Sequence, residues 1–272
     1  MAAEEDNPAA VTAVVPAYNE EDRIASVLET LSGVALIKDI IVVDDGSTDR
    51  TGEVVAGFEK VRYLRNPVNR GKGFAMDAGV QASAEDVIFF CDADLEGLSS
   101  EMVEEIIHPV LEDRFDMFVG ARKYKENLIT RTFVFLETKW GIYPTTGQRA
   151  LRKELWQKLP EAYKRNYRAE VGLNYLARRS GRGLGFKKFS YGHHKKEKKL
   201  GILKGLHVKL KMYGNVLGAS LRFRVLDRKV PGVRLRRPGG QDSFLDPRKR
   251  HGSQRRDHHH RRRHSRGPDD RA

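Results

Sequence analysis

Short apolar segments alternate with segments of helical spacing along the first half of the chain, and this alternation most constrains the fold. Thr48 or Asp49 is expected to cap the helix that contains Val54, Val55 and Phe58. We expect strands at residues 11–15, 40–43, 61–64, 87–91 and 116–119, and further helices at residues 20–31, 73–82 and 99–111. Strands that alternate with helices form a parallel sheet. The sequence therefore predicts an α/β fold, with a mostly parallel central sheet flanked by helices.

The second half of the chain is less regular. Helical spacing is present at residues 129–140, 153–159 and 169–179, and an extended segment is expected at residues 184–191. A basic loop at residues 193–199 precedes a stripe of apolar residues between positions 200 and 223. A basic amphipathic helix can lie on a membrane, but a helix packed on its own domain has the same periodicity and is commoner. We expect packing, and weak membrane contact stays open.

Length and composition bound the class of protein. A chain of 272 residues suits one large domain with an appendage. No apolar run approaches the roughly 20 residues needed to cross a bilayer, and the acidic start lacks the basic and apolar regions of a signal peptide. We therefore expect a cytoplasmic protein. The single cysteine, Cys91, falls in a predicted buried strand, so we expect a reduced structural thiol.

The formal charge of +13 is concentrated near the C-terminus. Residues 227–272 contain 15 Lys and Arg against 6 Asp, a net charge of +9, and few apolar residues. Such a segment cannot bury enough apolar surface to offset the entropy cost of ordering, so we expect a disordered basic tail. Its charge can attract nucleic acid or an anionic membrane, but we expect no specific nucleic-acid partner.

Two carboxylates, Asp92 and Asp94, directly follow the predicted buried strand at residues 87–91. Open α/β sheets bind ligands at the carboxyl ends of their strands. Mg²⁺ is usually held by one or two carboxylates together with substrate phosphates, so this pair suggests a metal that receives a phosphorylated ligand. An acidic turn without a ligand is the alternative, because Asp is common in turns.

Three other loops, at residues 16–21, 44–49 and 69–73, should lie at the same edge of the sheet. In the second, Asp44 and Asp45 can accept hydrogen bonds from a base or a ribose. In the third, Arg70 and Lys72 can bind a diphosphate, and the neighbouring glycines let the backbone approach closely.

Two other nucleotide-binding classes lose support. The segment that begins at Gly71 does not complete the Gly-x-Gly-x-x-Gly dinucleotide fingerprint, because Met76 occupies the last position. The chain also contains no Walker-type loop. A dehydrogenase and a P-loop enzyme are therefore disfavoured.

In their order and spacing the four loops resemble the family 2 glycosyltransferases, which have the GT-A fold, over roughly residues 11–200. The resemblance implies a Rossmann-like nucleotide-binding half, and it implies that Asp92 and Asp94 form the metal-associated Asp-x-Asp motif. The residues that it places around a nucleoside-diphosphate sugar are Pro16, Ala17, Asn19, Glu20, Asp45, Lys72, Asp92 and Ala93. The motif also looks like that of polyprenyl-phosphate sugar synthases, although a Gln often stands there in place of Glu96.

The second half resembles the glucosyl-3-phosphoglycerate synthases in the order of an acceptor loop, a Glu-x-Gly-Leu helix and a histidine. This layout implies that the acceptor is bound by Gly147, Gln148 and Arg149. It also implies that His193 or His194 completes a metal shell with Asp94. A neutral imidazole favours Mn²⁺ or a similar ion more than it favours Mg²⁺. The alternative is that both histidines belong to a solvated basic loop.

Glu170 is the second candidate catalytic residue, beside Asp94. It is expected to open a helix, where it can deprotonate or orient an acceptor hydroxyl, or can simply be a first-turn acid favoured by the helix dipole. The aromatic residues Tyr18, Trp140 and Trp156 are expected to be structural.

The resemblance implies a metal-dependent glycosyltransferase that uses Mg²⁺ or Mn²⁺ and a UDP- or GDP-linked sugar. The acceptor stays open between a polyprenyl phosphate, with peripheral contact at the inner face of the membrane, and a small phosphorylated acid. A nucleotidyltransferase and a nucleic-acid-binding protein are the alternatives of other classes. We expect a catalytic domain at residues 8–226, with a nucleotide-sugar half at about 8–120 and an acceptor half at about 121–226, and the tail at residues 227–272.

Overall fold

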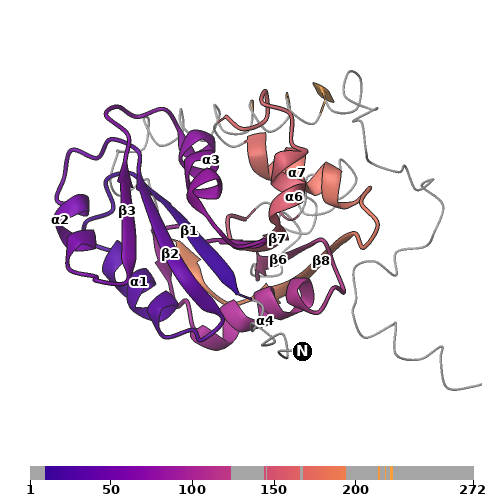
Figure 1. Ribbon diagram of the computed structural model, residues 1–272, viewed down its shortest axis with the longest axis horizontal. Helices are drawn as coiled ribbons and strands as arrows, with labels where there is room; N and C mark the ends of the chain where they lie inside the picture. The colour runs from indigo at the N-terminus through magenta and orange to yellow at the C-terminus, as the bar shows by residue number, and fades with distance from the viewer. Residues whose placement is uncertain are drawn as a thin grey trace, which may run out of the picture.

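A computed structural model describes residues 10–123, 144, 146–165 and 168–193, and four helical residues at positions 214, 218, 221 and 222. The strands of its main sheet are β1 (Val11–Ala17), β2 (Ile37–Asp44), β3 (Val61–Arg65), β4 (Val87–Phe90), β6 (Met117–Arg122), β7 (Arg149–Arg152) and β8 (Leu184–Phe189). They lie in the order β3-β2-β1-β4-β7-β6-β8 (Figure 1). A separate two-stranded ribbon is formed by β5 (Leu95–Glu96) and β9 (Gly192–His193).

Helices cover both faces of the main sheet. They are α1 (Ile24–Ser32), α2 (Thr51–Ala56), α3 (Lys72–Ala82), α4 (Ser100–Leu111), α6 (Lys153–Gln157) and α7 (Arg168–Ala177). In Figure 1, α3, α6 and α7 lie above the sheet, and α1 and α4 lie below it. The layers predicted from the alternation of strands and helices are confirmed.

The sheet is mostly parallel, as the sequence predicts. β1 pairs in parallel with both β2 and β4, β2 pairs in parallel with β3, and β6 pairs in parallel with β8. Only β7 runs antiparallel to its neighbours β4 and β6. The carboxyl ends of β1, β2 and β4 therefore open on one edge of the sheet.

Alternate residues of each strand pack into different clusters, because successive side chains of a strand point to opposite faces. Ala13 and Val15 of β1 pack in a cluster that includes residues of α1 and α4. Val14 of the same strand packs in a second cluster with residues of α3, α6 and α7. All three side chains are 0% exposed. Both faces of the strand are thus buried, which explains its uninterrupted apolar run.

Two element boundaries differ from the prediction for local reasons. α1 begins at Ile24 instead of residue 20, because Asn19 adopts a left-handed backbone with φ of 55° and the amides of Arg23 and Ile24 bond to the Glu20 carbonyl oxygen. α2 begins at Thr51 with Arg50 as its N-cap, so the expected cap at Thr48 or Asp49 is wrong, although an Asp49 carboxylate oxygen accepts from the Thr51 backbone amide.

The segment at residues 149–152, expected to belong to a loop, is the strand β7. A strand of four residues with charged residues at both ends shows little apolar periodicity, which explains why it is missed. Trp156 is buried against Phe90, as expected for a structural aromatic. The same expectation for Tyr18 is wrong, because its side chain is 44% exposed.

Several predictions lie outside the described residues. They are the helix at 129–140 with Trp140, His194 and the rest of the basic loop, most of the segment 200–223, and the tail. Cys91 is a free, buried thiol as predicted, and burial raises its pKa. Across the parts of the chain that the structure describes, helices are too short or too polar to cross a membrane.

Candidate active site

The predicted site residues converge on the carboxyl edge of the sheet. Asn19 and Glu20 follow β1, Asp45 follows β2, Lys72 opens α3, and Asp92 follows β4. Pro16 and Ala17 form the end of β1, where Ala17 is buried and pairs with Asp44 at the end of β2. The parallel order of these strands brings loops that are distant in the sequence to one place.

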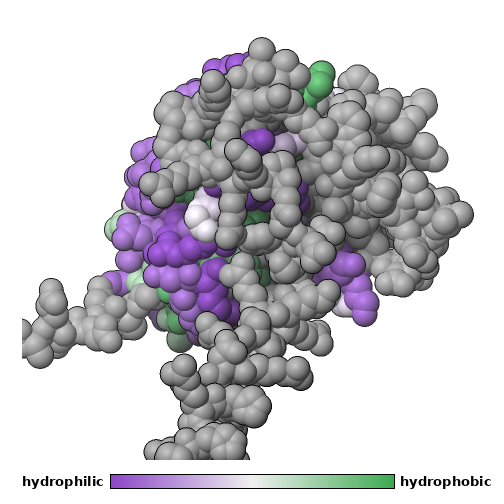
Figure 2. All heavy atoms as spheres, turned by 90° about the vertical axis from the view of Figure 1, so that its right-hand side faces the viewer, coloured by the Kyte–Doolittle hydropathy of each residue, from purple (hydrophilic) through white to green (hydrophobic). Residues whose placement is uncertain are grey.

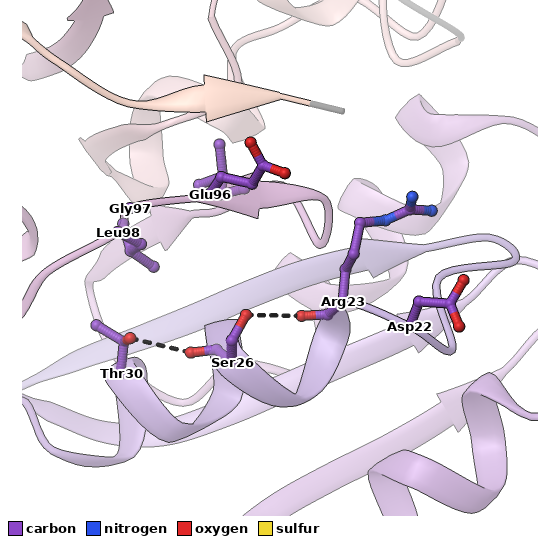
Figure 3. A pocket seen from close by; sticks show the side chains of 8 residues that line it. Asp22, Arg23, Ser26, Thr30, Glu96, Gly97 and Leu98 are labelled. Atoms are coloured by element: carbon purple, nitrogen blue, oxygen red, sulfur yellow. Dashed lines mark hydrogen bonds between the residues drawn. The ribbon is translucent and has the colours of Figure 1, made fainter. Parts of the chain in front are cut away.

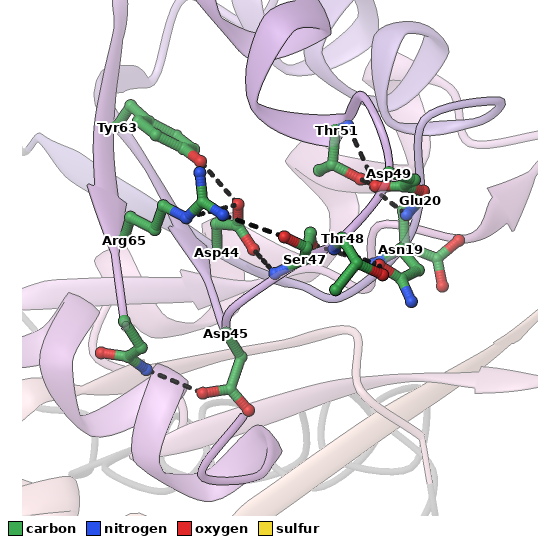
Figure 4. Close-up of polar contacts among 11 residues, drawn as sticks. Asn19, Glu20, Asp44, Asp45, Ser47, Thr48, Asp49, Thr51, Tyr63 and Arg65 are labelled. Atoms are coloured by element: carbon green, nitrogen blue, oxygen red, sulfur yellow. Dashed lines mark hydrogen bonds and ion pairs between the residues drawn. The ribbon is translucent and has the colours of Figure 1, made fainter. Parts of the chain in front are cut away.

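The loops after β1 and β2 are joined by reciprocal hydrogen bonds (Figure 4). The Asn19 backbone N–H donates to the Ser47 hydroxyl at 3.0 Å, and the Thr48 backbone N–H donates to the Asn19 side-chain oxygen at 2.8 Å. The Glu20 amide donates to Thr51 Oγ1 at 2.8 Å. Asn tolerates the left-handed conformation that this geometry requires at position 19. Asn19 therefore fixes the shape of two loops at once.

Both carboxylate oxygens of Asp44 accept hydrogen bonds from nearby residues. Asp44 is 0% exposed, and its two oxygens accept from the Ser47 amide at 2.7 Å and from the Tyr63 hydroxyl at 2.5 Å (Figure 4). Burial and the hydrogen bond to Asp44 raise the pKa of Tyr63 to about 12. Asp44 thus anchors the turn after β2 and does not face a ligand.

Asp45, predicted to bind the donor, holds the third loop in this structure. Its carboxylate accepts from the Asn66 side-chain amide at 2.8 Å and from the backbone amides of Arg70 and Gly71, the latter at 2.6 Å. The residue is 3% exposed. The loop that carries Lys72 is therefore set by Asp45.

Lys72 connects the two halves of the site. Its ammonium lies 2.7 Å from Asp92 Oδ1 and 2.7 Å from Glu170 Oε1, a residue 98 positions away in the sequence. Burial alone would lower the pKa of Lys72, but the charges of Asp92 and Glu170 hold it well above its usual value. A positive charge is therefore fixed between the acid after β4 and the acid at the start of α7.

Gly73 permits this contact between the halves. A Cβ atom at this position would lie 2.7 Å from the Lys164 carbonyl carbon and from the Arg165 amide nitrogen. The segment before α7 therefore rests directly on the first turn of α3, and only glycine leaves room for it.

Two donors contact the Asp92 carboxylate. Gln148 Nε2 donates to Asp92 Oδ2 at 3.0 Å, while Lys72 occupies Oδ1. A Cβ on Gly147 would overlap the Asp92 carboxylate. Ala93 is buried, and Asp94 is partly exposed at the mouth of the site.

One predicted metal ligand, His193, lies on a strand that pairs with the segment just after Asp94. The backbone of β9 pairs His193 with Leu95, the residue that follows Asp94, and His194 lies outside the described residues. Within the described ranges, no three His, Cys, Asp or Glu side chains form a preset cluster for a metal ion. By residue type, carboxylate oxygens and an imidazole nitrogen are ligands that suit Mg²⁺ or Mn²⁺.

The three residues expected to bind an acceptor are buried. Gly147 lies in the buried stretch before β7, and Gln148 and Arg149 are both 0% exposed. Arg149 Nη1 lies 3.3 Å from the Glu170 carbonyl oxygen and 3.3 Å from Asn174 Oδ1. Asn174 was not expected from the sequence, although its position four residues after Glu170 places it on the same side of α7.

A polar cleft of about 300 Å³ adjoins the site between α1 and β5 (Figure 3). One wall contains Asp22, Arg23 and Ser26 and continues from Glu20, and the other contains Glu96 and continues from Asp94. Arg23 is paired with Glu20, and the Ser26 hydroxyl is bonded to a backbone carbonyl. The cleft therefore begins beside the residues that follow Glu20 and Asp94 and runs along α1 as far as Thr30.

Comparisons with known proteins agree with this architecture. The family model described as glycosyl transferase family 2 matches residues 12–169. Glucosyl-3-phosphoglycerate synthase of Mycobacterium tuberculosis is 28% identical over 194 residues, which are 60% of this chain and 59% of that protein. Dolichyl-phosphate beta-glucosyltransferase of Drosophila melanogaster is 38% identical over 106 residues, 33% of this chain and 32% of that protein. The chain thus spans less than two thirds of the length of these relatives.

A solved structure shows the same fold. The crystal structure of the Mycobacterium tuberculosis glucosyl-3-phosphoglycerate synthase in complex with Mn²⁺, UDP-glucose and phosphoglyceric acid has a TM-score of 0.62 at 24% identity. The match covers 78% of this chain and 79% of that chain. The expected GT-A fold is confirmed.

Proposed function

The chain belongs to glycosyl transferase family 2, and on this premise we propose that it transfers a sugar from a nucleoside-diphosphate sugar to an acceptor oxygen. One observation carries the proposal. Lys72 lies 2.7 Å from both Asp92 and Glu170, so a cation joins the strand-end acids of the donor half to an acid of the acceptor half. A transferase must bring the donor phosphates and the attacking oxygen together, and the contact between the two halves provides a place for this.

The donor nucleotide is proposed to lie along the edge formed by the loops after β1, β2 and β4. We assign its recognition to Pro16, Ala17, Asn19, Glu20, Asp45, Lys72, Asp92 and Ala93. The reciprocal bonds between the first two loops support this assignment, because a preordered loop loses less entropy when it binds a ligand.

Asp92, Asp94 and one of His193 and His194 are proposed to hold a divalent cation. The cation would stabilise the charge that develops on the departing diphosphate. A relative's structure contains Mn²⁺ with UDP-glucose, which supports Mn²⁺ and a UDP-linked sugar for this chain, with Mg²⁺ and a GDP-linked sugar as alternatives.

Glu170 is proposed to accept the proton of the acceptor hydroxyl or to orient that hydroxyl. The carboxylate opens α7 and contacts Lys72, so its negative charge is stabilised beside the donor phosphates. Where the acceptor is itself a phosphate, no hydroxyl proton is removed, and Glu170 would then position Lys72.

A phosphate-bearing acceptor fits the rim of the site. Arg70 lies over the ring of Phe74 with 4.3 Å from the guanidinium carbon to the ring centre, and Arg165 lies 5.8 Å from the same centre. Both arginines are exposed, and they come from the two loops that meet at Gly73. Guanidinium groups recognise phosphate well. The acceptor is therefore proposed to be a polyprenyl phosphate at the inner face of the membrane or a small phosphorylated acid in the cytoplasm, as in the two kinds of relative.

The test is the release of nucleoside diphosphate from a panel of UDP- and GDP-sugars, with Mn²⁺ or Mg²⁺, and with or without each class of acceptor. We expect metal-dependent release that accelerates with one acceptor. Asp94→Asn should lower the rate by about 100-fold, because the cation that would stabilise the departing diphosphate loses a ligand. Asp86→Asn, an exposed change at the opposite end of β4, is the matched control. No release from any donor, or full activity of Asp94→Asn, would overturn the proposal.

A further inference from the structure

The turn at residues 146–149, which resemblance assigns to the acceptor, is in contact with the acids of the site. Antiparallel pairing of β7 with β4 places Arg149 opposite Phe90. The residues just before β7 therefore run beside the residues just after β4, including Asp92. Gln148 and Arg149 are both 0% exposed, so neither presents its side chain to a ligand from this position.

The first half of the turn holds Asp92. Gly147 leaves the space that the Asp92 carboxylate fills, since a Cβ there would overlap it. Gln148 Nε2 lies 3.0 Å from Asp92 Oδ2. The amide must point its nitrogen at the acid, because the reverse orientation would set two oxygens against each other.

This orientation of Gln148 has a stability cost. Its other amide atom, Oε1, is buried and has no hydrogen-bond partner among the residues that the structure describes. An unsatisfied buried acceptor costs free energy that an apolar side chain of similar shape would avoid. A residue kept for packing alone would be better replaced by Met, whereas a residue kept to orient Asp92 requires the amide.

The second half of the turn contacts the start of α7, the helix that carries Glu170. Arg149 Nη1 donates to the Glu170 carbonyl oxygen and to Asn174 Oδ1, both at 3.3 Å, and Nε donates to the Thr146 carbonyl oxygen at 3.2 Å. The guanidinium thus connects the turn to the first two turns of α7. Burial lowers the pKa of Arg149, and the charges of Glu170 and Asp92 oppose that change.

We propose that residues Gly147, Gln148 and Arg149 are a positioning element that sets Asp92 and Glu170 at a fixed separation across Lys72, so that the turn acts on donor binding through these acids. The inference rests on the proposed function, because it takes the acids to serve a sugar-nucleotide site. In this role, Gln148 orients a carboxylate that binds the donor or its cation. Arg149 fixes the position of the helix that carries Glu170.

The decisive variant is Gln148→Met, which keeps the length of the side chain and removes the amide. We expect the Kd for UDP or GDP, measured by calorimetry with Mn²⁺ present, to rise by about 10- to 100-fold, as for other groups that orient a metal-associated ligand. The melting temperature should change little, because removal of the unpaired Oε1 offsets the loss of the hydrogen bond to Asp92. Gln81→Met, the same change at an exposed position of α3, should alter neither quantity.

The alternative roles give different results. If the turn binds the acceptor, Gln148→Met leaves the Kd of the nucleotide unchanged and raises only the acceptor KM, which would overturn the inference. If Gln148 is merely structural, the variant melts earlier and its nucleotide affinity recovers on cooling, which would also overturn it. Asn174→Ala provides a second variant for the α7 side, with kcat expected to fall and nucleotide Kd to stay within about twofold.

The wild-type protein separates this inference from its premise. Wild-type protein that binds neither UDP nor GDP with Mn²⁺ would refute the proposed function and the inference with it. Wild-type protein that binds one of them, beside an unaffected Gln148→Met, would refute the positioning role alone.

Discussion

Two cations, Lys72 and Arg149, lie close to the two acids of the proposed site. The Lys72 ammonium contacts Asp92 and Glu170, and the Arg149 guanidinium interacts electrostatically with the same two acids from beneath. Two cations thus face two carboxylates in a partly enclosed site, where a lone charge would be costly. The arrangement places both acids beside cations before any ligand arrives, so binding requires little reorganisation.

Tyr63 should titrate late because of its bond to Asp44. With its pKa raised to about 12, the phenol of the folded protein should still be protonated when the unfolded chain, at about 10.0, has lost its proton. Its contribution to stability is therefore full below pH 10 and is lost as the pH rises from 10 to 12. Absorbance titration of the phenolates should show a step near pH 12 that is absent from Tyr63→Phe.

The exposed Tyr18 provides the control for this titration, because Tyr18→Phe removes a tyrosine without touching Asp44. The step near pH 12 should persist in that variant. A wild-type titration that is complete by pH 10.5 would contradict the bond between Tyr63 and Asp44.

The sequence predicts which residues gather at the site better than it predicts what each contacts. Lys72 and Asp92 were expected there because strand ends of a parallel sheet meet at one edge, and Glu170 was expected there from the family resemblance. Their mutual contact was not expected, since it depends on how the segment before α7 rests on Gly73. The burial of Gln148 and Arg149 was likewise not predictable, because resemblance transfers a position and says nothing of its exposure.

α3 packs directly against backbone where it meets the acceptor half. Ala at position 73 would bring a Cβ within 2.7 Å of backbone atoms of Lys164 and Arg165, which cannot rotate away. We expect Gly73→Ala to cost about 1–3 kcal/mol of unfolding free energy, as overpacking does. Because the displaced segment leads to α7, the contact between Lys72 and Glu170 should also loosen and turnover should fall.

Thermal melting and the nucleotide-release assay test this prediction together. Gly57→Ala is the matched control, because a Cβ there meets only the Val54 carbonyl oxygen at 3.3 Å and the backbone φ of −74° suits alanine. That variant should stay within about 0.5 kcal/mol of the wild type. Equal melting temperatures for Gly73→Ala and wild type would show that the two segments can separate at little cost.

Elements with strong periodicity are those that the sequence predicts well. β1, β2 and β4 contain continuous apolar runs because both of their faces are covered, and α4 begins within one residue of its predicted start, after the N-cap Ser99. β7 escapes prediction because its four residues owe their conformation to β4 and β6 on either side, which is tertiary context. The antiparallel insertion that shapes the site is therefore the part of the fold least visible in the sequence.

Across the molecule as a whole, the positive charge is concentrated in the C-terminal segment. Residues 227–272 hold +9 of the formal charge of +13. On the face shown in Figure 2, the described residues are mainly hydrophilic, with apolar side chains in small patches only. Among described residues the large exposed apolar side chains are Tyr18, Val68 and Leu221. Such a surface favours electrostatic over hydrophobic attachment to a membrane.

Binding to anionic liposomes should therefore depend on the tail and on salt. Each Lys or Arg near an anionic surface contributes about 1 kcal/mol, and screening shortens the Debye length from about 10 Å at 0.1 M to about 3 Å at 1 M. We expect the full chain to cosediment at low salt and to be released at high salt, and a variant that ends at Leu226 to lose this salt-sensitive binding. If that variant still binds, and binds more when polyprenyl phosphate is added, the acceptor is the lipid phosphate. If it binds neither liposome, the acceptor is the small phosphorylated acid, whose effect on nucleotide release the same truncated protein should retain.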